Sequence, residues 1–199
     1  MIVRRAAILA AVALSCPGCE RKSSPTITAD PSAKSAPSAS PAKSETVAIY
    51  TLVLRGHFDS YRDPARLRVI DATALPSCGT AATIASSIPT TRAETIATFG
   101  LLPTDQLLTP FSAALGVDLL PLGDAIRLLA SAPAPGAAAP VGWPVMGLVR
   151  VTPIAFDVAQ SDALVSYEHW STPTSRAAYV IHVVRREGAW FEQEILSCR

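Results

Sequence analysis

The four cysteines are the residues of this 199-residue chain whose chemistry is easiest to interpret. Cys16 and Cys19 follow an N-terminal apolar run, whereas Cys78 and Cys198 lie in the remaining sequence. Two cysteines in an exported domain most simply join, and a loop of about 120 residues closed this way contributes on the order of 4–5 kcal/mol. We therefore predict a Cys78–Cys198 disulfide. The alternative, a nucleophilic thiol at Cys78, needs an activating base that the neighbouring residues lack.

The histidines do not form a recognisable metal or catalytic motif. His57, His169 and His182 are widely separated, and no HExxH or Cys/His cluster is present. His57 with Asp59 and Asp63 supplies nitrogen and oxygen donors, but this composition is more typical of a solvated junction between a helix and a loop. We predict no metal site and no cofactor.

Two carboxylates have a spacing that glycosidases use. Glu192 and Glu194 are two residues apart, which in a regular strand places both on one face at roughly 6–7 Å. An exposed strand often carries such a pair, and Arg185 can neutralise it. No G-x-S-x-G elbow or glycine-rich phosphate loop is present. We therefore predict no catalytic residue.

The tryptophans are best explained as packing residues of the core. Trp170 differs, because it ends a predicted strand and precedes the polar segment 171–175. It is the one aromatic side chain that we keep as a candidate surface contact.

The N-terminal sequence has the features of a targeting signal. Arg4 and Arg5 precede the apolar run from Ala6 to Leu14, which is about half the roughly 20 residues that a membrane-spanning helix needs. The layout resembles a bacterial lipoprotein signal that ends at a lipid-accepting cysteine. Cys16 has the better preceding residues and Cys19 is the alternative, while an ordinary cleaved signal without lipid stays open. The expected location is the cell envelope, periplasmic and anchored by palmitate-bearing lipid to the inner or outer membrane.

The composition of the sequence divides the chain into three segments. Residues 1–15 form the signal peptide, 16–44 a tether, and 45–199 a single domain. Between Ser23 and Ser44, 16 of 22 residues are Ser, Pro or Ala, a composition that cannot bury enough surface to offset chain entropy. The domain has eleven Arg, no Lys and fourteen carboxylates, a net charge of −3. This charge gives no support to nucleic-acid binding.

Periodicity predicts an α+β domain, with N-terminal helices packed on a C-terminal antiparallel meander of about four strands. The expected helices are near 46–58, 91–100 and 109–116, and 78–89 reads as a loop. The expected strands are 67–73, 147–156, 163–170, 177–186 and 189–197, and 125–129 is either a strand or a helical turn. Glu187-Gly188 suits a two-residue hairpin turn that pairs Arg186 with Ala189.

Four stretches of this sequence are similar to those of one group of proteins: "GLVRVTPIAFDVAQSDALVSYEHW", "YVIHVVRREGAWFEQEILSC", "AIYTLVLR" and "LRVIDAT". They resemble uncharacterised bacterial exported proteins and lipoproteins with a "Gly-x-Trp" turn into the final strand. The matched stretches cover under half the chain. The resemblance implies a shared fold and no assigned function.

Two functions are compatible with these features. The first is a lipoprotein whose domain is a non-catalytic binding or structural unit, with an envelope protein or another ligand as its partner. The alternative is an envelope hydrolase with a spatially assembled site, in which His57 or His169 works with an acid or hydroxyl group.

Overall fold

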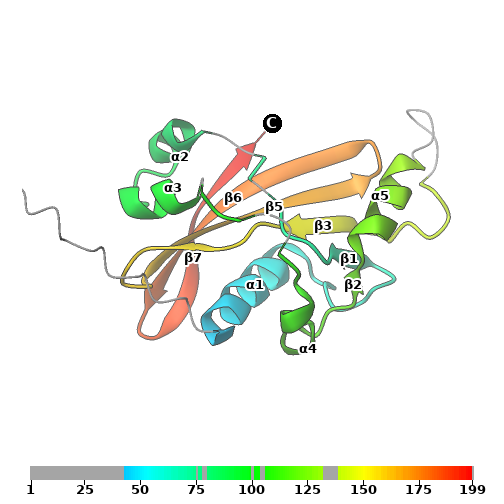
Figure 1. The fold of residues 1–199 in the computed structure, drawn as a ribbon, viewed down its shortest axis with the longest axis horizontal. Helices are drawn as coiled ribbons and strands as arrows, with labels where there is room; N and C mark the ends of the chain where they lie inside the picture. The colour runs from blue at the N-terminus through cyan, green and yellow to red at the C-terminus, as the bar shows by residue number, and fades with distance from the viewer. Residues whose placement is uncertain are drawn as a thin grey trace, which may run out of the picture. The chain divides into compact units, whose positions relative to one another are not determined.

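The computed structural model describes residues 43–74, 76–77, 80–99, 101–103, 106–131 and 139–198 (Figure 1). Its helices are α1 (Lys43–His57), α2 (Ala81–Ser87), α3 (Ala93–Phe99), α4 (Ser112–Leu115) and α5 (Leu122–Ala130), with the 3-10 turn η1 (Thr109–Phe111). Its strands are β1 (Leu67–Ile70), β2 (Leu119–Leu120), β3 (Gly147–Val151), β4 (Ala155–Phe156), β5 (Asp162–Thr172), β6 (Ser175–Arg186) and β7 (Ala189–Cys198). This is the predicted α+β class.

The strands form one mixed sheet with the order β2-β1-β3-β5-β6-β7, and β4 pairs with β5. The predicted antiparallel meander is present as β3, β5, β6 and β7, and the sheet is larger than predicted because β1, β2 and β4 bring it to seven strands. The difference arises because β1 pairs in parallel with both β2 and β3, while β3, β5, β6 and β7 are antiparallel. Parallel partners are joined through long connections and leave no local turn signal. The sequence therefore predicted a strand at 67–73 but neither its pairing in the sheet nor the short strand β2.

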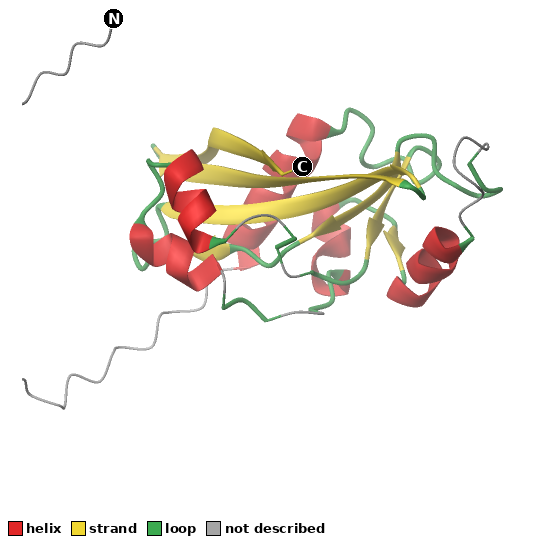
Figure 2. Ribbon diagram, turned by 90° about the horizontal axis from the view of Figure 1, so that it is seen from above, coloured by secondary structure: helices red, strands yellow, loops and turns green. Residues whose placement is uncertain are grey.

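Helices cover both faces of the sheet (Figure 2). On one face α1 buries Ile49, Tyr50, Val53 and Leu54 against the largest apolar cluster, which includes Val165 of β5. We call this the α1 face. On the opposite face α2 and α3 pack over β5 and β6, and α5 packs at the other end, over β1 and β3. The α1 face holds the larger core.

The helix boundaries have identifiable local causes. α1 has Glu45 in its first turn and Arg55 and His57 in its last, which suits the helix dipole. α2 lies in the segment predicted as a loop, and Thr80 begins it by accepting a hydrogen bond from the Thr83 amide. α4 ends at Gly116, whose φ of 65° suits glycine. The prediction missed α2 because its residues are small and its one buried apolar residue is Ile84.

The β6–β7 hairpin has the predicted turn and an unpredicted irregularity. Glu187 and Gly188 have φ values of 51° and 83°, and Arg186 pairs with Ala189 as expected. Further along, Val183 pairs with Glu192 but His182 pairs with Glu194, so Gln193 is an extra residue in β7. This β-bulge reverses the inward and outward positions of β7 beyond Gln193.

Candidate functional site

The bulge brings Glu194 to the face of the sheet that α2 and α3 cover. There Glu194 lies opposite His182 of β6, which itself lies opposite Leu164 of β5. His182 is 0% exposed although it is polar, and a buried imidazole needs hydrogen-bond partners on both nitrogens. The neighbouring elements supply them.

Asp162, Thr90 and Glu194 surround His182. The Nε2 atom of His182 lies 2.7 Å from Oδ2 of Asp162, and its Nδ1 atom lies 3.2 Å from the Thr90 hydroxyl. The Thr90 hydroxyl is also 2.7 Å from Oε2 of Glu194. Thr95 of α3 donates to the second oxygen of Asp162 at 2.7 Å. We call these five residues the His182 network. It joins β5, β6 and β7 to the segment between α2 and α3.

A second buried carboxylate lies beside this network. Asp157 accepts hydrogen bonds from the amides of Ser161 and Asp162 at 2.7 and 2.9 Å, and it pairs with Arg92. A pocket of about 460 Å³ opens here. Its lining residues are Thr90, Arg92, Ser161, Asp162, His182, Val184, Arg185, Arg186 and Gln193. The pocket thus contains a hydroxyl group, an imidazole and a carboxylate within hydrogen-bond reach.

Glu192 lies on the α1 face, away from Glu194. Its Oε1 atom is 3.3 Å from Nε2 of His57, and a Cβ placed on Gly56 would lie 2.9 Å from that same oxygen. The two glutamates therefore do not form the predicted same-face pair, because the bulge separates them. Burial, followed by the charges of Tyr179 and Glu192, raises the pKa of Tyr167, whose ring stacks on Tyr179 at 5.0 Å.

The other predicted residues are held by packing contacts. His169 packs its ring on Phe58 at 5.1 Å and donates from Nε2 to the Met146 carbonyl at 2.5 Å. Trp170 is half-buried and packs against the apolar cluster that contains Ala125 of α5. The Arg176 guanidinium lies 5.8 Å from its ring. Among the contacts of the described residues, His57 lies beside an acid, Glu192, but neither His57 nor His169 is joined to a hydroxyl group. A surface-contact role for Trp170 remains a prediction.

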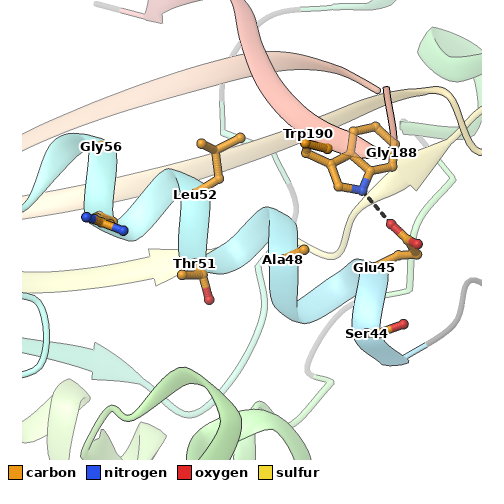
Figure 3. A pocket seen from close by; sticks show the side chains of 10 residues that line it. Ser44, Glu45, Ala48, Thr51, Leu52, Gly56, Gly188 and Trp190 are labelled. Atoms are coloured by element: carbon orange, nitrogen blue, oxygen red, sulfur yellow. Dashed lines mark hydrogen bonds between the residues drawn. The ribbon is translucent and has the colours of Figure 1, made fainter. Parts of the chain in front are cut away.

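A second hollow lies along the outer side of α1 (Figure 3). We call it the α1 groove; it has a volume of about 760 Å³. Its lining residues are Ser44, Glu45, Ala48, Thr51, Leu52, Arg55 and Gly56 of α1, with Gly188, Ala189 and Trp190 from the β6–β7 hairpin. The Trp190 indole donates to Glu45 at 2.5 Å, and Arg185 lies 3.1 Å from the other oxygen of Glu45. These contacts fix the indole as one wall of the groove.

Cys16, Cys19 and Cys78 lie outside the described residues, so the predicted lipidation and disulfide remain predictions. Cys198 ends β7 and packs against the cluster that contains Ile84 of α2. Across the described ranges, no helix is both long and apolar enough to cross a membrane. The same residues contain no group of three His, Cys, Asp or Glu side chains arranged to hold a metal ion.

No known protein family, curated protein or solved structure matches this chain.

The sequence reasoning missed Thr90 and Asp162 and gave His182 no role. A usable signal was present, because His182 interrupts an otherwise apolar strand between Val180 and Val184 on the same face. A polar residue at such a position implies a buried partner. The identity of that partner depends on tertiary pairing, which the sequence pattern does not report.

Proposed function

We propose that this chain is a cell-envelope lipoprotein whose α+β domain is a non-catalytic binding unit held on a tether. The basic and apolar N-terminus supports export, and the residues before Cys16 support lipid attachment there, with Cys19 as the alternative. The Ser, Pro and Ala composition of the following segment supports an extended spacer between membrane and domain.

We propose the α1 groove as the binding site. The observation that carries this proposal is its volume of about 760 Å³ along α1, with an indole wall held by Glu45. The side chains of Ala48, Leu52 and Trp190 offer apolar surface, while Arg55 and Glu45 provide opposite charges. Pockets with apolar walls and few polar groups are typical binding sites. The occupant that fits is an extended segment of an envelope protein with an apolar side chain.

Site-specific photocrosslinking tests this site in the full, membrane-attached chain. A benzophenone amino acid at Ala48, which is exposed, is expected to give a defined adduct in the envelope. The matched control is Ala82, another exposed alanine, in α2 on the other face. Leu52→Glu introduces a charge into the groove and is expected to abolish the adduct. Equal adducts at both positions, or no effect of Leu52→Glu, would exclude the groove as the binding site.

The anchor is tested separately, by palmitate labelling of the wild type, Cys16→Ser and Cys19→Ser with and without globomycin. Labelling that is lost only in Cys16→Ser is expected. Unlabelled wild-type protein, or intact precursor in the cytosol, would overturn the anchor and leave the groove proposal to its own test.

A second candidate function is hydrolysis of an ester at Thr90. The observation in its favour is the sequence of contacts from the Thr90 hydroxyl to His182 and then to Asp162 within one pocket. Thr90 Oγ would attack the ester carbonyl and pass its proton to His182, which returns it to the leaving alcohol. Water would then hydrolyse the acyl–Thr90 bond, and Thr90 would regain its proton.

Release of p-nitrophenol from p-nitrophenyl acetate tests this candidate. Activity that disappears in Thr90→Val but persists in Ser161→Ala, a change in the same pocket, would support it. Equal rates in wild type and Thr90→Val would exclude it.

A further inference from the structure

When the imidazole is neutral and both carboxylates are ionised, the His182 network has fewer protons than hydrogen-bond contacts. Three contacts run in series: Asp162 to His182 at 2.7 Å, His182 to Thr90 at 3.2 Å, and Thr90 to Glu194 at 2.7 Å. Each contact requires one proton between its two heavy atoms. The series therefore needs three protons.

With both carboxylates ionised and the imidazole neutral, only two protons are present. One is on the imidazole and one on the Thr90 hydroxyl, because ionised carboxylates only accept. If Thr90 donates to Glu194, its oxygen must accept from Nδ1 of His182, while Nε2 must also donate to Asp162. This requires an imidazolium. Alternatively the third proton is on Glu194 or on Asp162, so every arrangement needs the same additional proton.

The third proton affects how firmly α2 and α3 are attached to the sheet. Thr90 lies in the segment between the two helices, and we call its contacts with His182 and Glu194 the Thr90 bridge. We propose that the Thr90 bridge holds this segment to β6 and β7 only while the network carries its third proton, so that rising pH loosens α2 and α3.

Charged side chains from several elements surround the His182 imidazole. His182 lies 2.7 Å from Asp162 of β5 and 3.7 Å from Glu194 of β7. Arg92, before α3, and Arg185 and Arg186, at the end of β6, line the adjoining pocket. Arg92 pairs with buried Asp157 from the β4–β5 loop, and Arg186 with Gln193. Two carboxylates therefore face the imidazole, one from β5 and one from β7.

Loss of the third proton leaves two oxygen lone pairs facing each other at the Thr90–Glu194 contact, or an unfilled contact at Nδ1. The neutral imidazole keeps its proton on Nε2, because the Nε2 lone pair would otherwise face the ionised Asp162 at 2.7 Å. One side of the Thr90 bridge must therefore separate. Because Ile84, Ile88, Ile96 and Phe99 remain packed on the sheet, the result is local opening rather than global unfolding.

Amide hydrogen exchange of the full chain at about pH 6 and about pH 9, corrected for intrinsic exchange, tests the proposal. In the wild type, protection of α2 and α3 relative to β5 is expected to fall about tenfold at the higher pH. Glu194→Gln supplies a permanent N–H donor to Thr90, so its protection is expected to be independent of pH. Thr90→Val removes the bridge and is expected to show low protection at both pH values.

Glu192→Gln is the matched control, since it makes the same change two residues away on the α1 face. It is expected to follow the wild type. Wild-type protection that does not change with pH, or a Glu194→Gln profile that falls like that of the wild type, would overturn the proposal. Since Glu194→Gln is nearly isosteric, its result stands even if Thr90→Val does not fold.

Discussion

Glu192 and Glu194 are two residues apart on β7, yet their side chains lie on opposite faces of the sheet. Glu192 contacts His57 of α1 at 3.3 Å, whereas Glu194 contacts Thr90 at 2.7 Å beneath α2 and α3. The extra residue Gln193 causes this separation. A single bulge therefore changes a potential pair of carboxylates into two separate contacts, each joining the sheet to a different helical layer.

This separation predicts that the two glutamates contribute independently to stability. Glu192→Gln and Glu194→Gln should have changes in unfolding free energy that add within about 0.5 kcal/mol in the double variant, because they share no contact. Urea unfolding of the four proteins measures this. A coupling free energy well above that value would mean that the side chains interact, as they would in an unbulged strand.

Because the Tyr50 hydroxyl is buried, we expect the domain to lose stability at alkaline pH. Burial raises the pKa of Tyr50 far above its ordinary value of 10.0, and its hydroxyl donates to the Thr152 carbonyl at 3.0 Å. Above about pH 10 the unfolded chain releases this proton while the folded protein retains it, so the unfolding free energy falls as pH rises. Tyr167, whose pKa is also raised, contributes in the same direction.

Tyr50→Phe should therefore weaken the alkaline fall. At neutral pH it should cost about 1 kcal/mol through the lost hydrogen bond. Urea unfolding at neutral pH and above about pH 10 measures the cost of the substitution and the alkaline fall in unfolding free energy. The same slope in wild type and variant would contradict the assignment of this loss to Tyr50.

Gly147 and Gly142 form a matched pair for a test of close packing. Both have positive φ, 96° and 86°, but a Cβ on Gly147 would lie 1.9 Å from the Trp170 carbonyl oxygen, whereas Gly142 has nothing within 4 Å. Gly147→Ala should destabilise the domain by more than about 3 kcal/mol, because β3 must move away from β5. Gly142→Ala should cost only about 1 kcal/mol, from backbone strain. Thermal unfolding distinguishes them, and equal losses would contradict the register of β3 and β5.

The Cys78–Cys198 disulfide stays a prediction, because the structure describes only one of these two cysteines, Cys198. Cys198 packs against the cluster that contains Ile84 and Ile88, and in the sequence Cys78 precedes Ala81, the first residue of α2, by three positions. Peptide mapping without reductant should find the two cysteines joined. Reduction should then destabilise the domain by on the order of 4–5 kcal/mol, less if the bond is strained. Free thiols at both positions would remove the prediction.

Local patterns predicted the elements that have strong local signals. The apolar spacing in α1, the glycine after α4 and the Glu187-Gly188 turn each correspond to a structural feature at the expected place. α2 lacked such spacing, and its single buried apolar residue gave no periodicity. The bulge at Gln193 also escaped prediction, because both faces of β7 carry apolar residues and the pattern therefore does not fix a single register.

The sequence by itself determined the α+β class, the β6–β7 hairpin and the composition on which the export and tether predictions rest. These depend on periodicity, turn residues and polarity, which are properties of neighbouring residues. Only the tertiary structure decided the parallel pairing of β1, the faces of Glu192 and Glu194, and the assembly of Thr90, Asp162 and His182. The hydrogen bonds of the His182 network join residues 20 to 104 positions apart, so packing rather than local preference selects them.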